Sequence, residues 1–169
     1  MSDRIAVINR GRLEQVGSGE DIYERPRTRF VAGFMGVENF FEVTCTGLAD
    51  KAARFETSAG LTLWAKNGCD FAERIQATLA VRPECVRLAL DFPGATNGPL
   101  NLLQGEVVEA IYEGGSRRWS VRLPSGEHLV VREANAGDSS VLAGTGCGAR
   151  VYLFWEPEKS LVYPCEGAR

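Results

Sequence analysis

Two pairs of carboxylates in this chain of 169 residues lie close enough in the sequence to share acid–base work: Asp21 with Glu24, and Glu156 with Glu158. General acid–base catalysis requires such groups within hydrogen-bond reach of the reacting atoms. The same spacing is typical of a solvated protein surface, and that interpretation is favoured for both pairs.

A hydroxyl nucleophile with a histidine base is the second candidate chemistry. Ser139 and Ser140 could supply the hydroxyl, and His128, the only histidine, could supply the base. No nucleophile-elbow sequence surrounds either serine, so an exposed histidine on a hairpin is the preferred interpretation. A single histidine also argues against a histidine cluster that binds a metal.

The glycine-rich stretch 144–148 suggests a phosphate-binding loop. Such a loop places its amides at a helix N-terminus, and a Walker-type loop also needs a lysine directly after a glycine. Here a predicted strand, residues 149–155, follows instead. None of the three lysines, Lys51, Lys66 and Lys159, follows a glycine. We therefore expect a turn between two strands.

Arg117 and Arg118 beside Trp119 could bind a single-stranded nucleic acid, as barrels of the OB type do. However, 19 basic against 22 acidic residues give a net charge of −3, which argues against a nucleic acid partner. The cysteines are odd in number, and none lies in a C-x-x-C pair, which argues against a zinc knuckle or a disulfide framework. They are Cys45, Cys69, Cys85, Cys147 and Cys165. No group of residues makes a convincing catalytic constellation.

The elements that position these residues change in kind near residue 38. Residues 5–8 and 13–16 predict a hairpin, and residues 20–24 predict a helix. Thr28 can cap a second short helix that ends at Gly36, with Phe30, Val31 and Phe34 on one side. No apolar run approaches the roughly 20 residues of a membrane helix. No secretory signal is visible, so we expect a soluble, cytoplasmic chain.

The remainder, residues 39–169, predicts short strands separated by turns, and therefore a small β-barrel or sandwich. Turn residues between 93 and 99 divide it into two lobes, about 39–92 and 100–169. Each lobe contains a strand, then x-Pro-Glu, then another strand: Arg82-Pro83-Glu84 and, 74 positions later, Glu156-Pro157-Glu158. This repetition predicts two related lobes. The expected strand cores are residues 41–45, 61–65, 75–81, 86–90, 103–112, 119–123, 129–131, 151–155 and 161–163.

Residues 2–36, SDRIAVINRGRLEQVGSGEDIYERPRTRFVAGFMG, resemble the end of the nucleotide-binding domain of ABC-transporter importer ATPases. The remainder is similar to their TOBE (transport-associated OB) region, through Asn39-Phe40-Phe41, residues 81–84, Gly105-Glu106-Val107, residues 112–115 and residues 148–158. The resemblance implies a mainly β fold. It would be an OB-like TOBE barrel of two related lobes, preceded by a hairpin and short helices left over from the ATPase domain, residues 1–38.

The resemblance leans toward the spermidine/putrescine branch. It implies a cytoplasmic accessory domain, peripheral to the membrane through permease subunits, that supports a homodimer or a pairing with another ATPase subunit and receives regulation. ATP and Mg²⁺ serve the full-length family. The Walker A, signature, Walker B and switch-histidine motifs are absent from this sequence, so we expect no ATP hydrolysis by this chain and no cofactor or metal in it. The residues expected at domain interfaces are Arg82, Glu84, Tyr112, Trp155, Glu156 and Glu158.

Three further expectations concern the chain as a whole. It would be a truncated gene product, a domain or a proteolytic remnant, and a short product that modulates a full-length ATPase is one variant of this hypothesis. The alternative is a stand-alone OB-fold module that binds an oxyanion or an oligonucleotide. The hairpin at residues 5–16 would pair with another copy, lie on the barrel or be poorly ordered, because a lone two-stranded hairpin is marginally stable.

Overall fold

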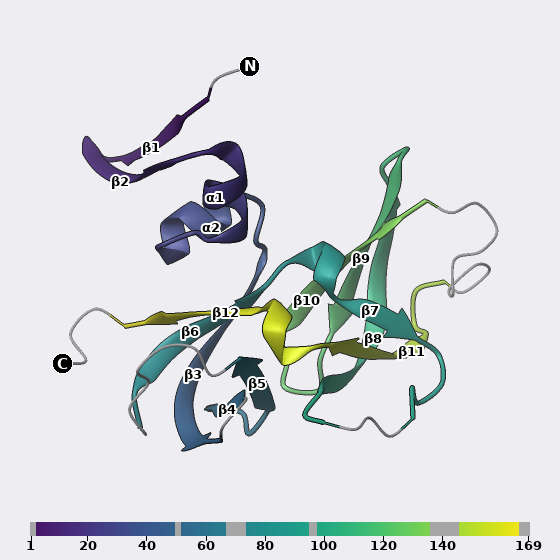
Figure 1. Cartoon of the computed structure of the whole chain (residues 1–169). Helices are drawn as coiled ribbons and strands as arrows, with labels where there is room; N and C mark the ends of the chain where they lie inside the picture. The colour runs from purple at the N-terminus through teal and green to yellow at the C-terminus, as the bar shows by residue number, and fades with distance from the viewer. Residues whose placement is uncertain (1–2, 50–51, 67–73, 95–97, 136–145, 166–169) are drawn as a thin grey trace. The chain divides into compact units, whose positions relative to one another are not determined.

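The computed structural model describes residues 3–49, 52–66, 74–94, 98–135 and 146–165 (Figure 1). Contacts between Cα atoms divide the chain into two compact units, Met1–Val37 and Glu38–Arg169, called unit 1 and unit 2 below. The division lies where the sequence pattern changes from a hairpin and helices to strands.

Unit 1 consists of a hairpin and two short helices. Strands β1 (Ile5–Asn9) and β2 (Arg12–Gly17) pair antiparallel around Gly11, whose φ of +79° suits glycine. Helices α1 (Gly19–Glu24) and α2 (Arg29–Phe34) follow. The hairpin and both helices agree with the elements predicted from the sequence.

Each helix of unit 1 begins at a side-chain cap. The Ser18 hydroxyl accepts a hydrogen bond from the Asp21 amide at 3.0 Å, and the Thr28 hydroxyl accepts one from the Val31 amide at 3.2 Å. Caps of this kind contribute about 1 kcal/mol each. They define where helices of only six residues begin, since propensity alone is too weak to do so.

The hairpin packs on the two helices of its own unit, an arrangement not among the three that we expected. Val7 from β1 joins a buried cluster with side chains from both helices, Ile22 and Val31, and Met35 packs against it. Phe30, Val31 and Phe34 were predicted on one side of α2, but Val31 is buried, whereas the rings of Phe30 and Phe34 lie together at the surface. Both rings are exposed and stack on each other, with centroids 6.5 Å apart.

The described residues of unit 2 form two five-stranded antiparallel sheets, ordered β12-β6-β3-β4-β5 and β10-β9-β8-β11-β7. The strands of the first half of this unit are β3 (Asn39–Leu48), β4 (Ala52–Thr57), β5 (Thr62–Lys66), β6 (Gln76–Val81) and β7 (Arg87–Ala89). Those of the second half are β8 (Asn101–Tyr112), β9 (Ser116–Arg122), β10 (His128–Ala134), β11 (Arg150–Trp155) and β12 (Ser160–Pro164).

The two lobes repeat one topology and exchange their last strands. In the first lobe β3, β4, β5 and β6 form a sheet, and β8, β9, β10 and β11 form the same arrangement in the second. Strand β7 then pairs with β11 in the second sheet, while β12 pairs with β6 in the first (Figure 1). Two related lobes were predicted from the repeated x-Pro-Glu segment, but the exchange was not.

One buried core joins the two sheets of unit 2. Its largest fully buried side chains come from both lobes: Trp119, Trp155, Phe55, Leu63, Leu79, Leu129 and Leu153. The rings of Phe41 on β3 and Trp155 on β11 stack across it, with centroids 6.5 Å apart. Because the core is shared and the last strands are exchanged, we infer that neither lobe has a complete core by itself.

Strand β4 was missing from the sequence prediction. It begins with Ala52 and Ala53, which have low strand propensity, yet both are buried along with Phe55. Ala53 and Phe55 lie on the same face of β4 and join the core of unit 2, whereas Ala52 points to the opposite face of the sheet. Tertiary context thus determines this strand.

Candidate functional site

The two x-Pro-Glu segments form equivalent crossover turns between the sheets. Pro83 and Pro157 each begin a 3₁₀ turn, η1 (Pro83–Cys85) and η3 (Pro157–Lys159). The residue before each proline has nearly the same backbone conformation, with φ/ψ of −70°/142° at Arg82 and −71°/145° at Glu156. Proline favours this extended conformation in the preceding residue, which directs the chain from one sheet into the other.

The expected interface residues fall into two groups in the structure. Glu84, Tyr112 and Glu158 are exposed, and Glu156 is half-buried and forms an ion pair with Arg87 at 3.6 Å. Trp155 is fully buried and Arg82 is 7% exposed. Trp155 and Arg82 therefore support the two turns from inside unit 2.

A buried polar network joins Trp155 to the start of β12 and to the other sheet. The Trp155 Nε1–H donates to the Ser160 hydroxyl at 3.0 Å, and that hydroxyl donates to the Trp64 carbonyl at 2.8 Å. Asn101, which is 0% exposed, donates from Nδ2 to the same carbonyl at 2.9 Å and accepts from the Trp64 amide at 2.6 Å. Buried polar groups paired in this way fix one arrangement of the lobes.

Asn39 makes the equivalent contact from the first sheet to the second. Its Nδ2 donates to the Val130 carbonyl at 2.8 Å, and its Oδ1 accepts from the Val130 amide at 2.7 Å. Asn39 begins β3, as Asn101 begins β8, and each side chain bonds the terminal strand of the other sheet. Neither asparagine was predicted to have this role, although both start the first strand of a lobe.

The outer surface of unit 2 carries a charged cluster around Glu38. Its carboxylate forms ion pairs with Arg118 at 2.8 Å and with Arg132 at 3.3 Å, and Arg132 also pairs with Glu113 at 3.3 Å. The hydrogen bond to Glu38 raises the pKa of Arg118 above its ordinary value. Because the Glu38 carboxylate already pairs with the positively charged Arg118, this guanidinium is poorly placed to bind phosphate groups.

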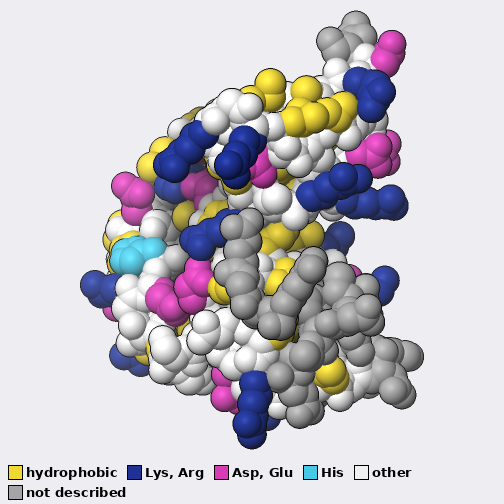
Figure 2. Space-filling view, turned by 90° about the vertical axis from the view of Figure 1, so that its left-hand side faces the viewer, with side chains coloured by type: hydrophobic (Ala, Val, Ile, Leu, Met, Phe, Trp, Pro, Cys, Tyr) yellow, Lys and Arg dark blue, Asp and Glu magenta, His cyan; other side chains and the backbone are white. Residues whose placement is uncertain are grey.

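The arrangement around Trp119 does not favour a nucleic-acid interface. The ring is 1% exposed, so it offers no platform for a base to stack on. Arg117 lies over that ring with its guanidinium carbon 5.6 Å from the centroid, and Arg118 is held by Glu38. On the face drawn in Figure 2, Lys and Arg side chains are interspersed with Asp and Glu side chains.

The remaining candidate chemistry finds no support in the described residues. His128 is exposed, with Nδ1 3.4 Å from the Ser120 hydroxyl. Asp21 accepts from the Ser18 hydroxyl at 2.8 Å, as part of the α1 cap. Within the part of the chain that the structure describes, no group of three His, Cys, Asp or Glu residues could hold a metal. Ser139, Ser140, Gly144, Thr145, Cys69 and Lys51 lie outside the described residues.

The described part of the glycine-rich stretch forms the expected turn. Gly148, with φ of +91°, donates its amide to the Val107 carbonyl at 2.7 Å, and β11 begins two residues later. The four described free cysteines are Cys45, Cys85, Cys147 and Cys165.

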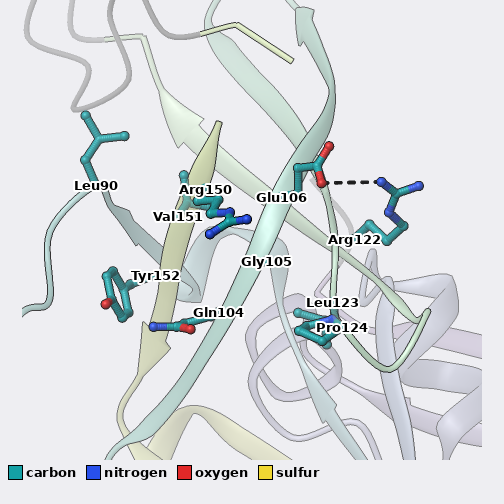
Figure 3. A pocket seen from close by; sticks show the side chains of 10 residues that line it. All are labelled: Leu90, Gln104, Gly105, Glu106, Arg122, Leu123, Pro124, Arg150, Val151 and Tyr152. Carbon is teal, nitrogen blue, oxygen red and sulfur yellow. Dashed lines mark hydrogen bonds and ion pairs between the residues drawn. The ribbon is translucent and has the colours of Figure 1, made fainter. Parts of the chain in front are cut away.

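A pocket of about 570 Å³ lies at the end of the β8–β9 pairing, beside Glu106 and Arg122, and it is called the lobe 2 pocket below. It is lined by Leu90, Gln104, Gly105, Glu106, Arg122, Leu123, Pro124, Arg150, Val151 and Tyr152 (Figure 3). The Arg122 guanidinium contacts the Glu106 carboxylate at 3.4 Å. Figure 3 shows Arg150 beside Gly105, with Leu90 and Tyr152 on one side and Arg122 and Glu106 on the other.

A second pocket of about 390 Å³ occupies the equivalent place in the first lobe and is called the lobe 1 pocket. The pairing of Gly105 with Val151 in lobe 2 corresponds to that of Val43 with Ala77 in lobe 1. The lobe 1 pocket is lined by Glu42, Val43, Thr44, Thr46, Glu56, Thr57, Ser58, Gln76, Ala77 and Cys165. Neither pocket had been anticipated from the sequence, because each combines residues from at least three strands.

Comparison with protein families matches residues 79–162 to the TOBE domain. Three proteins named spermidine/putrescine import ATP-binding protein PotA match more of the chain. That of Thermobifida fusca is 38% identical over 164 residues, covering 97% of this chain and 41% of the relative. Those of Treponema pallidum and Acidothermus cellulolyticus are 40% and 36% identical, covering 78% and 94% of this chain. The chain spans 36–41% of the length of these relatives.

The fold is similar to that of the cytoplasmic molybdate-binding protein ModG in its molybdate-bound crystal form. The TM-score is 0.64 at 16% identity, covering 75% of this chain and 96% of that one. This likeness confirms the predicted OB-like fold. No helix among the described residues is long and apolar enough to cross a membrane. The chain belongs to the TOBE-containing ATP-binding subunits of ABC transporters and corresponds to the C-terminal part of such a subunit.

Proposed function

We propose that this chain acts within an ABC importer of the spermidine/putrescine type, where unit 2 supports the pairing of ATP-binding subunits and regulates ATP-driven uptake. The observation that carries this proposal is the 38% identity to the Thermobifida fusca import protein across 97% of the chain. Two ATP-binding subunits and the permease subunits are the partners. The complex lies on the cytoplasmic side of the membrane and uses ATP and Mg²⁺ bound elsewhere in the subunit.

The chain itself does not hydrolyse ATP in this account. Phosphoryl transfer depends on backbone amides and a lysine that cradle the phosphates, and on carboxylates that hold Mg²⁺. The sequence contains none of the motifs that supply these groups, and neither described pocket has a lysine in its lining. Unit 2 therefore assists a catalytic domain.

Unit 1 supports the same proposal through its exposed apolar side chains. Ile8, Leu13 and Phe34 are 63%, 62% and 68% exposed, which is unusual for such residues in a small folded unit. The relatives are more than twice as long as this chain. In a full-length subunit, the rest of the ATP-binding domain would cover these side chains.

The pairing of subunits requires a surface on unit 2 that stays available. Glu84 and Glu158 lie on the two equivalent turns, and Tyr112 is 63% exposed near the end of β8. An interface formed there, away from the ATP sites, could persist while the catalytic domains open and close. A regulator would act by binding one of these states more tightly than the other.

Sedimentation equilibrium of the purified chain tests this proposal. We expect a concentration-dependent dimer that is weakened at least tenfold by the double substitution Tyr112→Ser with Glu158→Lys. Ile8→Ser with Leu13→Ser in unit 1 is the matched control, since it removes exposed apolar surface outside unit 2. A chain that stays monomeric, or a dimer lost only through the unit 1 substitutions, would refute pairing through unit 2.

A further inference from the structure

We propose that the lobe 2 pocket binds a small organic carboxylate, with Arg150 and Arg122 on the carboxylate group and the apolar lining on its carbon body. This site is separate from the pairing of subunits proposed above, and either proposal can fail without the other. The charge and size of the pocket, and its duplication in lobe 1, support this assignment.

The charge of the pocket favours an anion. Two guanidinium groups, Arg122 and Arg150, and one carboxylate, Glu106, leave a net charge of +1. Glu106 contacts Arg122 at 3.4 Å, whereas the side chain of Arg150 makes no ion pair or hydrogen bond with any other described residue. A carboxylate ligand would give Arg150 the bidentate partner that guanidinium groups favour.

The size and lining of the pocket favour an organic ligand. A volume of about 570 Å³ falls in the range of pockets that hold small organic molecules, and it far exceeds the need of a bare ion. Accessible carbon surface in the lining comes from three segments, through Leu90, Pro124 and the Tyr152 ring, whereas Leu123 and Val151 are buried in the core behind it. Gln104 and the Tyr152 hydroxyl offer hydrogen bonds, and the Tyr152 ring is held edge-on by Phe92 at 5.8 Å.

Gly105 positions Arg122 at this pocket. A Cβ atom on Gly105 would lie 2.5 Å from Cγ1 of Val121 and 2.8 Å from the Arg122 carbonyl. Only glycine therefore allows β9 to pass so close to β8 at this point. The close approach brings Arg122 to the wall of the pocket, opposite Glu106 in the strand register.

The lobe 1 pocket shows that the charge is a property of the side chains and not of the fold. At the position of Arg122 lobe 1 has Glu56, and at the position of Arg150 it has Gln76, as the two strand registers place them. Glu42 adds a second carboxylate, Glu56 pairs with Arg54 at 2.7 Å, and no described Lys or Arg lines the lobe 1 pocket. The molecule thus contains its own control, a pocket at the equivalent place without a cation in its described lining.

Titration of the ¹⁵N-labelled chain with sodium benzoate, followed by amide NMR, tests the proposal. Benzoate should shift amides of the lobe 2 pocket, while its neutral analogue benzamide and inorganic phosphate should bind at least tenfold more weakly. Amides around the lobe 1 pocket should not move. Equal binding of benzamide would overturn the role of charge, and equal binding of phosphate would overturn the role of the carbon body.

Three substitutions assign the binding to the named residues. Arg150→Gln should raise the Kd of benzoate at least tenfold, and Glu106→Gln should lower it by removing the competing carboxylate. Lys66→Gln, an equal change of charge at an exposed position of β5, should leave the Kd within twofold. Thermal unfolding of each variant checks that the fold is kept. A Kd unchanged in folded Arg150→Gln would contradict the proposal.

Discussion

Asn39 and Asn101 hold equivalent positions in the two lobes, and each bonds the backbone of one residue on the terminal strand of the other sheet. Asn39 faces Val81 in the register of the first sheet, and Asn101 faces Trp155 in that of the second. The terminal strand of each sheet is therefore hydrogen-bonded by an asparagine side chain from the other lobe. The two asparagines interlock the halves of unit 2 where their last strands are also exchanged.

Replacing either asparagine should destabilise unit 2 strongly. Asn101→Ala removes the side-chain partner of the Trp64 amide and leaves the Trp64 carbonyl with the Ser160 hydroxyl alone, and an unpaired buried group costs about 1–3 kcal/mol. We expect Asn39→Ala to lower the free energy of unfolding by a similar amount. Urea denaturation measures both effects. Asn135→Ala, at an exposed position, should change stability by less than about 0.5 kcal/mol. Equal effects at positions 101 and 135 would contradict the interlock.

Gly105 should tolerate no side chain. Gly105→Ala would force a Cβ into Val121 and the Arg122 carbonyl, and overpacking of this kind costs roughly 1–3 kcal/mol. Gly115 is the matched control, since a Cβ there would meet nothing within 4 Å. Thermal denaturation of both variants compares them. If Gly105→Ala is as stable as Gly115→Ala, then β8 and β9 do not approach each other as closely as described.

Tyr163 makes the stability of the chain fall at high pH. Burial raises the pKa of its phenol to about 12, from an ordinary value of 10.0. Between pH 10 and 12 the unfolded chain loses this proton while the folded chain keeps it, so the free energy of unfolding decreases as pH rises. Tyr163→Phe should reduce that decrease. Urea denaturation at pH 9 and pH 11 measures it, and an identical pH dependence in the variant would contradict a raised pKa.

The purified chain should not hydrolyse ATP. The rate of phosphate release in the presence of Mg²⁺ should equal that of a buffer blank at every ATP concentration, because the sequence has no motif that binds the triphosphate. A mock preparation from cells without the gene controls for contaminating ATPases. Release that rises in proportion to the amount of this chain would contradict the assignment of an accessory role.

The sequence predicted most strands of unit 2 because their apolar residues alternate with polar ones, as Phe41, Val43 and Cys45 do on β3. It also predicted the two lobes, because Pro83 and Pro157 impose the same turn at a fixed spacing. It could not predict that β7 and β12 change sheets, since local pattern carries no information about the pairing partner. Strand β4 was missed because Ala52 and Ala53, with which it begins, give no sequence pattern that distinguishes a strand from a helix or a loop.

The candidate site was less accessible from the sequence. Trp155 was expected at a domain interface through the resemblance, but it is buried, and its indole donates to the Ser160 hydroxyl of the exchanged strand β12. The roles of Asn39 and Asn101 depend on contacts spanning 91 and 37 positions. The two pockets become comparable only when the strand registers are known. The duplicated turn, with its offset of 74 residues, was the one signal that could have pointed to them.

The central claim is that unit 2 serves as the accessory domain of an import ATP-binding subunit. Its most direct test replaces the corresponding C-terminal region of the Thermobifida fusca relative with residues 38–169 and measures ATP-dependent spermidine uptake by the assembled transporter. The account predicts uptake within about threefold of the parent, and much lower uptake when that region is simply deleted. Uptake by the hybrid as low as that of the deletion, with the hybrid folded and bound to its permease, would contradict the account.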